Sequence, residues 1–334
     1  MSRASGIGSW PGEDVGMVCR TVRDLLADDG VPYLPELPAR GPGADLIGRT
    51  AALLVDLPVD LQPSGWRFVD RPGRDQRRAD AFLRQDLDEL AETYDGYRGE
   101  LKLQVAGPWT LASEIAVTRG ERSVADPGAT RDVVESLAEG VRRHVTTVQR
   151  LVPGAALLVQ VDEPGLPAAL AGRLTTVSGF GRVRAVDPQE AREGLRTVLD
   201  AAGERPTVVH CCAPAVPLPL LRAAGAGAVA IDVSLLGPQG WESVAATVES
   251  GVALWAGAVG DLPDEAARTA HAAGRVAERL ATSWQRVGLP LADLDAVVVT
   301  PACGLAGADG AHAATRAHEV AVRAAKELGE RAHG

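Results

Sequence analysis

Eight short runs of apolar and β-branched residues alternate along this 334-residue chain with longer segments of helical periodicity. A repeated strand-then-helix pattern is typical of a parallel α/β fold, and eight such units are the number that closes a barrel. The sequence therefore predicts a (β/α)8 TIM barrel with its active site at the C-terminal ends of the strands. The expected strands are Ser5–Trp10, Val31–Leu34, Leu101–Val105, Ala156–Val161, Thr207–Cys211, Ala228–Val233, Val252–Ala256 and Ala296–Thr300.

The clearest helical segment is Pro127–Leu151, where apolar residues recur at three- and four-residue steps between Arg and Glu. The other expected helices are Asp14–Ala27, Ala79–Tyr94, Pro188–Ala202, Trp241–Ser250, Asp264–Val287 and Ala311–Leu328. Two regions interrupt the pattern: residues 35–75 are rich in Pro and Gly, and residues 166–186 are expected to form a hairpin after the fourth strand. Since nothing resembles a linker, we expect residues 1–334 to form a single catalytic barrel with these two excursions over its mouth.

Composition excludes several classes of function. The hydrophobic fraction of 46% suffices for a large core, and 34 basic against 44 acidic residues give a net charge of −10, which opposes binding to a phosphate backbone. The first residues lack the apolar core of a secretion signal, and no apolar run approaches the roughly 18 residues that cross a membrane. We expect a cytoplasmic protein that binds neither nucleic acid nor membrane.

Cysteine and histidine residues stand at the ends of expected strands. His210 and Cys212 alternate with Cys211, so their side chains project to one side while that of Cys211 faces away. Cys303 ends the eighth strand, which barrel closure brings to the same rim. Two sulfurs and one imidazole are ligands of a catalytic zinc site. Asp232, at the end of the sixth strand, is either a fourth ligand or a helix N-cap.

Acidic and glycine-rich motifs mark the other strand ends. Asp162 and Glu163 follow an apolar strand, so one carboxylate is expected to point into the mouth, to hold an amine or move a proton, and the other toward the helix layer or a cap. Alternatively, Asp162 only caps the next segment. Glu36 is a second candidate for holding an amine, or else a surface charge. At the end of the first strand, the glycines around Gly8 and the adjacent Ser9 let backbone amides approach a carboxylate.

Six motifs resemble, in order and over nearly the whole chain, the catalytic barrel of cobalamin-independent methionine synthase. The spacing of the His-x-Cys and Pro-x-Cys-Gly-Leu motifs is the most specific part of the resemblance. The motifs are Ile7-Gly8-Ser9-Trp10-Pro11, Gly107-Pro108-Trp109-Thr110-Leu111, Gln160-Val161-Asp162-Glu163-Pro164, His210-Cys211-Cys212, Ile231-Asp232 and Pro301-Ala302-Cys303-Gly304-Leu305.

The resemblance implies zinc-dependent methyl transfer to the thiol of homocysteine, or of a similar small thiol, with Zn2+ keeping the sulfur ionised. It implies that Ser9 meets the carboxylate of the substrate and that Asp162 and Glu36 hold its amino group. The implied zinc ligands are His210, Cys212 and Cys303, with Asp232 at a position where the family usually has Glu.

Two departures from the family pattern concern the methyl donor. Full-length family members carry a second, N-terminal barrel that helps to hold methylfolate, and this chain has the length of the catalytic barrel alone. Residues 257–263 also lack the His that the family offers after the seventh strand. The donor is therefore either a methylated corrinoid protein or methyltetrahydrofolate. Two other functions stay open: a metal-free enzyme similar to uroporphyrinogen decarboxylase, and a non-catalytic zinc- or thiol-binding accessory protein.

Overall fold

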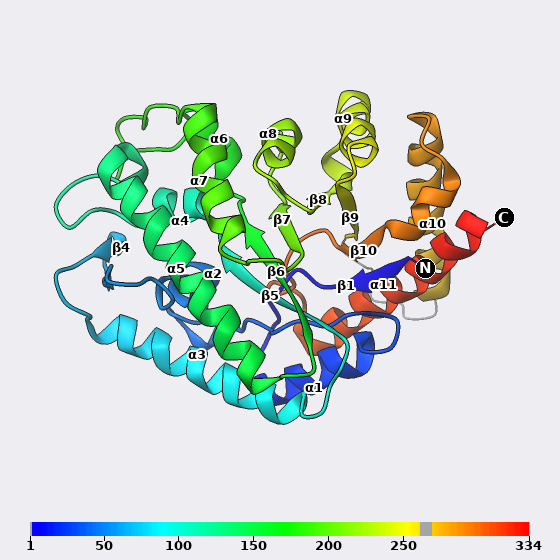
Figure 1. Ribbon diagram of the computed structural model, residues 1–334, viewed down its shortest axis with the longest axis horizontal. Helices are drawn as coiled ribbons and strands as arrows, with labels where there is room; N and C mark the ends of the chain where they lie inside the picture. Colours follow the sequence, from blue (N-terminus) through cyan, green and yellow to red (C-terminus); the bar gives the residue numbers. More distant parts are fainter. Residues whose placement is uncertain (1, 261–268, 334) are drawn as a thin grey trace.

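An eight-stranded parallel sheet curls into a barrel in the computed structural model, which describes residues 2–260 and 269–333 (Figure 1). The strand order is β2-β1-β10-β9-β8-β7-β6-β5. A parallel bridge between Tyr33 and Lys102 joins the two edge strands, with the Lys102 N–H donating to the carbonyl of Pro32 at 2.9 Å. The predicted (β/α)8 architecture is therefore confirmed.

The barrel strands lie close to their expected positions from the third one onward. They are β1 (Arg3–Ser5), β2 (Gly30–Val31), β5 (Glu100–Ala106), β6 (Ala156–Asp162), β7 (Thr207–Cys211), β8 (Ala228–Asp232), β9 (Ala253–Val259) and β10 (Val298–Pro301). The first two strands were predicted too far along the chain, since Ser5–Trp10 and Val31–Leu34 were expected where the structure has Arg3–Ser5 and Gly30–Val31. Beyond Ser5 the backbone pairs with the loop after β2, where the Trp10 N–H donates to the carbonyl of Glu36 at 2.8 Å.

Helices follow the strands and surround the barrel (Figure 1). Asp126 caps the long helix α5 by accepting from the N–H groups of Gly128 and Ala129, and the predicted start at Pro127 is correct. The expected helix Asp264–Val287 is described from Thr269 onward, and its first residues lie outside the described part. The helices are α1 (Val15–Leu26), α2 (Leu46–Ala51), α3 (Arg74–Thr93), α4 (Pro108–Glu114), α5 (Pro127–Leu151), α6 (Leu166–Leu170), α7 (Pro188–Asp200), α8 (Leu218–Ala223), α9 (Pro238–Glu249), α10 (Thr269–Arg286) and α11 (Gly310–His333).

Both excursions contain local structure. Residues 35–75 hold α2 and an antiparallel hairpin of β3 (Val59–Gln62) and β4 (Gly65–Phe68), which the sequence did not predict. Residues 166–186 hold α6 and then a turn closed by one antiparallel bridge between Thr175 and Arg182, so the expected hairpin is present without regular strands. Within the described ranges no helix is long and apolar enough to cross a membrane.

Two layers of side chains fill the barrel interior. Alternate residues of each strand point inward, so an apolar residue and the polar residue two positions later share the interior face. In β6 these are Leu158, Gln160 and Asp162, and in β7 they are Val208 and His210. The apolar layer comprises Val31, Leu158, Val208, Ala228, Trp255 and Val298, and Ala230, in register with His210, extends this cluster to the level of the polar residues. The buried polar layer, nearer the C-terminal ends, consequently sits above apolar side chains.

Candidate metal centre at the C-terminal ends of the strands

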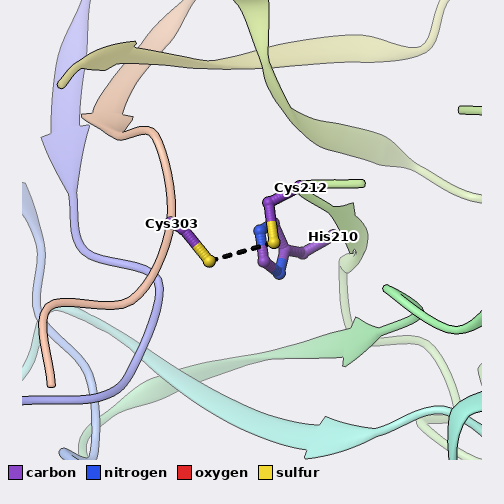
Figure 2. A group of neighbouring side chains, drawn as sticks. All are labelled: His210, Cys212 and Cys303. Carbon is purple, nitrogen blue, oxygen red and sulfur yellow. Dashed lines mark hydrogen bonds between the residues drawn. The ribbon is translucent and has the colours of Figure 1, made fainter. Parts of the chain in front are cut away.

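His210, Cys212 and Cys303 come together from two separate parts of the barrel rim. His210 belongs to β7, Cys212 directly follows that strand, and Cys303 follows β10. Their ligand atoms all lie within 4.8 Å of one another, and the two sulfurs are 2.9 Å apart. Figure 2 shows the three side chains pointing toward a common point. The group is buried at His210, half-buried at Cys212 and exposed at Cys303, so it opens toward solvent on one side.

The imidazole of His210 has one nitrogen occupied and one free. Nδ1 lies 2.7 Å from Oδ1 of Asp162, whereas Nε2 is buried and has no hydrogen-bond partner. A buried polar atom without a partner is costly in a folded protein, but an imidazole nitrogen in this state suits a metal ion. Two sulfurs and this nitrogen form a donor set typical of zinc, and the residues therefore fit a zinc ion.

The two thiols share a hydrogen bond that separates their acidities. This bond lowers the pKa of Cys303 to about 6, while the same bond, followed by burial, raises the pKa of Cys212. Cys303 is therefore the more acidic thiol of the pair. Metal binding requires deprotonated cysteine, so both sulfurs must be in the thiolate form when an ion binds. Cys211, the residue before Cys212, is buried and is not part of the ligand group.

Asp162 and Glu163 point in opposite directions, as the strand alternation predicts. Oδ1 of Asp162 accepts from Nε2 of Gln160 at 2.7 Å and contacts Nδ1 of His210. The carboxylate of Glu163 instead accepts at the start of α4, from the N–H of Trp109 at 3.0 Å and from the N–H and Oγ1 of Thr110 at 2.8 and 2.7 Å. Asp162 therefore orients the imidazole of His210. Its assignment as an amine holder remains a prediction.

Gly107 makes room for the Glu163 carboxylate. A Cβ atom at this position would overlap the carboxyl group of Glu163, which is fully buried and held by three hydrogen bonds. We expect Gly107→Ala to displace that carboxylate and to lower the free energy of unfolding by about 1–3 kcal/mol, because buried N–H groups of α4 lose their acceptor. Denaturant unfolding measures the loss. The exposed Gly237, where a Cβ meets open space, supplies the control Gly237→Ala, and equal losses in both variants would contradict the packing argument.

Asp232 does not belong to the candidate ligand group of His210, Cys212 and Cys303. Its Oδ1 accepts from the N–H of Ser234 at 2.9 Å and from the Ser234 hydroxyl at 2.6 Å, which caps the short helical turn after β8. This is the capping alternative that the sequence left open. Asp232 as a fourth ligand remains a prediction.

Glu36, Gly8 and Ser9 join the loops around the ligands. The Glu36 N–H donates to the carbonyl of Gly8 at 3.1 Å, and Ser9 pairs with Glu36 in a parallel bridge. Ser9 also reaches the Cys303 loop, since its carbonyl accepts from the N–H of Leu305 at 2.9 Å. Glu36 is 4% exposed, so the surface-charge interpretation is wrong. Its Oε1 has no partner, and burial raises the pKa of Glu36 to about 7. Substrate roles for the three residues stay predictions.

The raised pKa of Glu36 predicts a pH dependence of stability. In the unfolded chain the carboxyl loses its proton near its ordinary pKa of 4.5, whereas the folded protein retains it until about 7. The free energy of unfolding therefore falls as the pH rises through this window. The fall is about 3 kcal/mol, because the folded and unfolded pKa values differ by about 2.5. We expect Glu36→Gln to remove this pH dependence. The difference in free energy of unfolding between variant and parent should therefore be more favourable to the variant at pH 8 than at pH 5. Denaturant unfolding at the two pH values measures it. The control Glu135→Gln, at an exposed position, should show the same change in the free energy of unfolding between the two pH values as the parent. If Glu36→Gln also showed the parent's change, burial would not shift the pKa of Glu36.

Sequence reasoning missed the buried polar residues below the ligands. Lys102 and Gln160 are fully buried, and Gln104 is 5% exposed. Nζ of Lys102 donates to Oε1 of Gln160 at 2.8 Å, and Gln104 donates to the carbonyl of Leu34 at 2.6 Å. The available signal was a polar residue at alternate positions of apolar strands, as in Leu101-Lys102-Leu103-Gln104. Such residues face the interior of a closed barrel.

No model of a known protein family matches the chain, and no curated protein matches its sequence. Among solved structures, a B12-independent methionine synthase from a Shewanella species, in complex with selenomethionine, is similar with a TM-score of 0.49 and 14% identity. That match covers 72% of this chain and 65% of the Shewanella chain, so this chain spans only part of that protein. A putative sugar phosphate isomerase/epimerase from Anabaena variabilis is similar with a TM-score of 0.38 and 13% identity, over 80% of this chain and 88% of the other. These similarities do not identify an activity.

Proposed function

We propose that the protein is a zinc-dependent methyltransferase that moves a methyl group to the thiol of homocysteine and so forms methionine. The observation that carries the proposal is the buried, unpartnered Nε2 of His210 beside the sulfurs of Cys212 and Cys303. The motif resemblance in the sequence supports homocysteine as the acceptor. Zinc, when bound, supplies Lewis acidity that lowers the pKa of a thiol substrate.

The surrounding residues bind and orient the substrate in this proposal. His210, Cys212 and Cys303 hold the ion, and the carboxylate of Asp162 fixes the imidazole. The unpartnered Oε1 of Glu36 offers an acceptor to the substrate ammonium group, which also favours the ionised form of this buried carboxyl. Ser9, bridged to Glu36, offers its hydroxyl to the substrate carboxylate. Holding both polar ends of the amino acid aligns its sulfur with the methyl donor.

We propose a methylated corrinoid as the preferred donor over methyltetrahydrofolate. The sequence of residues 257–263, at and after the end of β9, contains no His that could protonate a folate leaving group. A methyl group leaving a corrinoid needs no such acid.

A methyl-transfer assay on zinc-loaded protein tests the proposal. Homocysteine is offered with methylcobalamin, methyltetrahydrofolate or its polyglutamate, and methionine is quantified by mass spectrometry. We expect about one zinc per chain and methionine from methylcobalamin. Protein without zinc and without methionine from any donor would favour the decarboxylase-like alternative. Zinc and homocysteine binding without methionine would identify an accessory protein. Faster transfer from folate would overturn the choice of donor but retain the reaction.

A further inference from the structure

Lysine is rare in this chain, which has two lysines, Lys102 and Lys326, among 34 basic residues. Lys326 lies on α11 and forms an exposed ion pair with Asp29 at 2.6 Å. Lys102 points into the barrel from β5 and is fully buried. A buried ammonium group is costly to desolvate unless its donors are satisfied. A chain that otherwise uses arginine for almost all of its basic residues therefore places one of its two lysines in the interior of the barrel.

The surroundings of Lys102 satisfy its ammonium group. Nζ donates to the carbonyl of Ile7 at 2.7 Å and to Oε1 of Gln160 at 2.8 Å, and it lies 4.9 Å from the centre of the Tyr33 ring. Lys102 pairs in register with Leu158 of the apolar layer, so its side chain starts below the polar layer and extends upward into it. Burial lowers the pKa of Lys102 to about 7, and the nearby charges of Asp162 and Glu36 oppose this shift and favour the ammonium form. Lys102 thus links the floor of the barrel to the polar layer.

The contact with Lys102 determines how the Gln160 amide is oriented. An ammonium group has donors only, so Gln160 must offer Oε1 to it and turn Nε2 the other way. Nε2 then donates to the carbonyl of Ile7 at 2.9 Å and to Oδ1 of Asp162 at 2.7 Å. With the amide reversed, Gln160 would place a donor against Lys102 and an acceptor against a carboxylate. Both contacts would be repulsive.

Gln160 in turn positions the carboxylate of Asp162, whose contact with His210 determines the tautomer of the imidazole. Gln160 holds Oδ1 of Asp162 in place, and this oxygen lies 2.7 Å from Nδ1 of His210. A carboxylate can only accept, so the proton of the neutral imidazole sits on Nδ1. The lone pair is then on Nε2, the buried atom without a partner. Each step places a donor against an acceptor, from Lys102 to the ligand atom.

We propose that Lys102 is a positioning residue of the metal centre, which fixes the His210 tautomer and ring orientation through Gln160 and Asp162 without contacting metal or substrate. Its effect on metal affinity rests on the proposed zinc site, whereas its effect on the tautomer concerns the metal-free protein. Loss of partners that orient a metal-binding His typically weakens metal affinity by about 10- to 100-fold. The same range is expected for Lys102→Met, which keeps the length of the side chain but loses the charge and the donors.

The experiment combines two readouts at one fixed pH. Nitrogen-15 NMR of the imidazoles in metal-free protein reports the tautomer of His210, with its signals assigned by comparison with His210→Gln. Competition with a chromophoric chelator gives the zinc affinity. We expect the parent to carry the proton on Nδ1, and Lys102→Met to show a mixture of tautomers and about 10- to 100-fold weaker zinc binding. Lys326→Met should match the parent in both.

Gln160→Met provides a second, independent variant, because it removes the amide and retains Lys102. It should produce the same two changes, so the proposal stays testable if Lys102→Met does not fold. A folded Lys102→Met with the parent tautomer and zinc affinity would overturn the inference and leave the proposed function intact. If the parent bound no zinc, the proposed function would be wrong. The comparison of tautomers would still decide the role of Lys102.

Discussion

Replacing Cys303 by serine is expected to abolish tight zinc binding and, with it, methyl transfer. Serine does not ionise near neutral pH and offers a hard oxygen where the site offers soft sulfur. Because loss of a residue that merely orients a ligand costs about 10- to 100-fold, loss of a ligand should cost more than about 100-fold in affinity. Cys303 is exposed in a loop, so the metal-free variant should unfold within about 0.5 kcal/mol of the parent. Metal analysis and chelator competition measure the first effect, and denaturant unfolding measures the second.

Cys211→Ser is the matched control for this experiment. Cys211 neighbours the ligand Cys212 in sequence, but it is buried and faces away from the ligand group. A hydroxyl in its place should lower the free energy of unfolding by about 1–3 kcal/mol, since it buries a polar group in apolar surroundings. Zinc affinity should stay at the parent value. If Cys303→Ser retained one zinc at parental affinity, the three side chains would not be a metal centre.

The barrel could be predicted because its strands are short apolar runs that end in polar residues. In β7 the predicted and observed bounds coincide, since Thr207 and Cys211 frame the apolar run. The first strand was predicted too far along the chain, because Gly6 to Trp10 is also largely apolar. There the backbone bonds to the loop after β2, a contact between distant segments that local patterning cannot reveal. The β3–β4 hairpin was also missed, because local patterning does not reveal its strands within a Pro- and Gly-rich stretch.

The candidate metal ligands could be proposed from the sequence because cysteine and histidine are rare and stood at strand ends. The partner of Asp162 could not be read from sequence, because it depends on the register that sets Asp162 beside His210 across β6 and β7. Lys102 was overlooked because a single lysine in an apolar strand does not indicate that its side chain is buried. The pairing of β5 with β6 places its ammonium group against the Gln160 amide, and barrel closure places it against the Ile7 carbonyl.

Loss of charge at the neighbouring carboxylates Asp162 and Glu163 should affect two different properties of the protein. Asp162→Asn keeps the shape of the side chain but weakens the acceptor for Nδ1 of His210, so zinc affinity should fall by about 10- to 100-fold. Glu163→Gln keeps one acceptor oxygen and turns an NH2 group toward α4, whose N–H groups and Thr110 hydroxyl supply three donors. The free energy of unfolding should therefore fall by about 1–3 kcal/mol. Zinc affinity should not change.

Zinc affinity and denaturant unfolding, both measured on the two variants at pH 8, test this division of roles. Burial raises the pKa of Glu163 to about 7, so at pH 8 its carboxylate is ionised in the parent and the comparison is with the charged form. Each variant serves as the control for the other, because the two residues are adjacent and both are buried. An equal loss of zinc affinity in both would show that the charge of the region, and not the contact between Asp162 and His210, supports the site. Weaker zinc binding in Asp162→Asn alone would assign the effect to the orientation of a single imidazole.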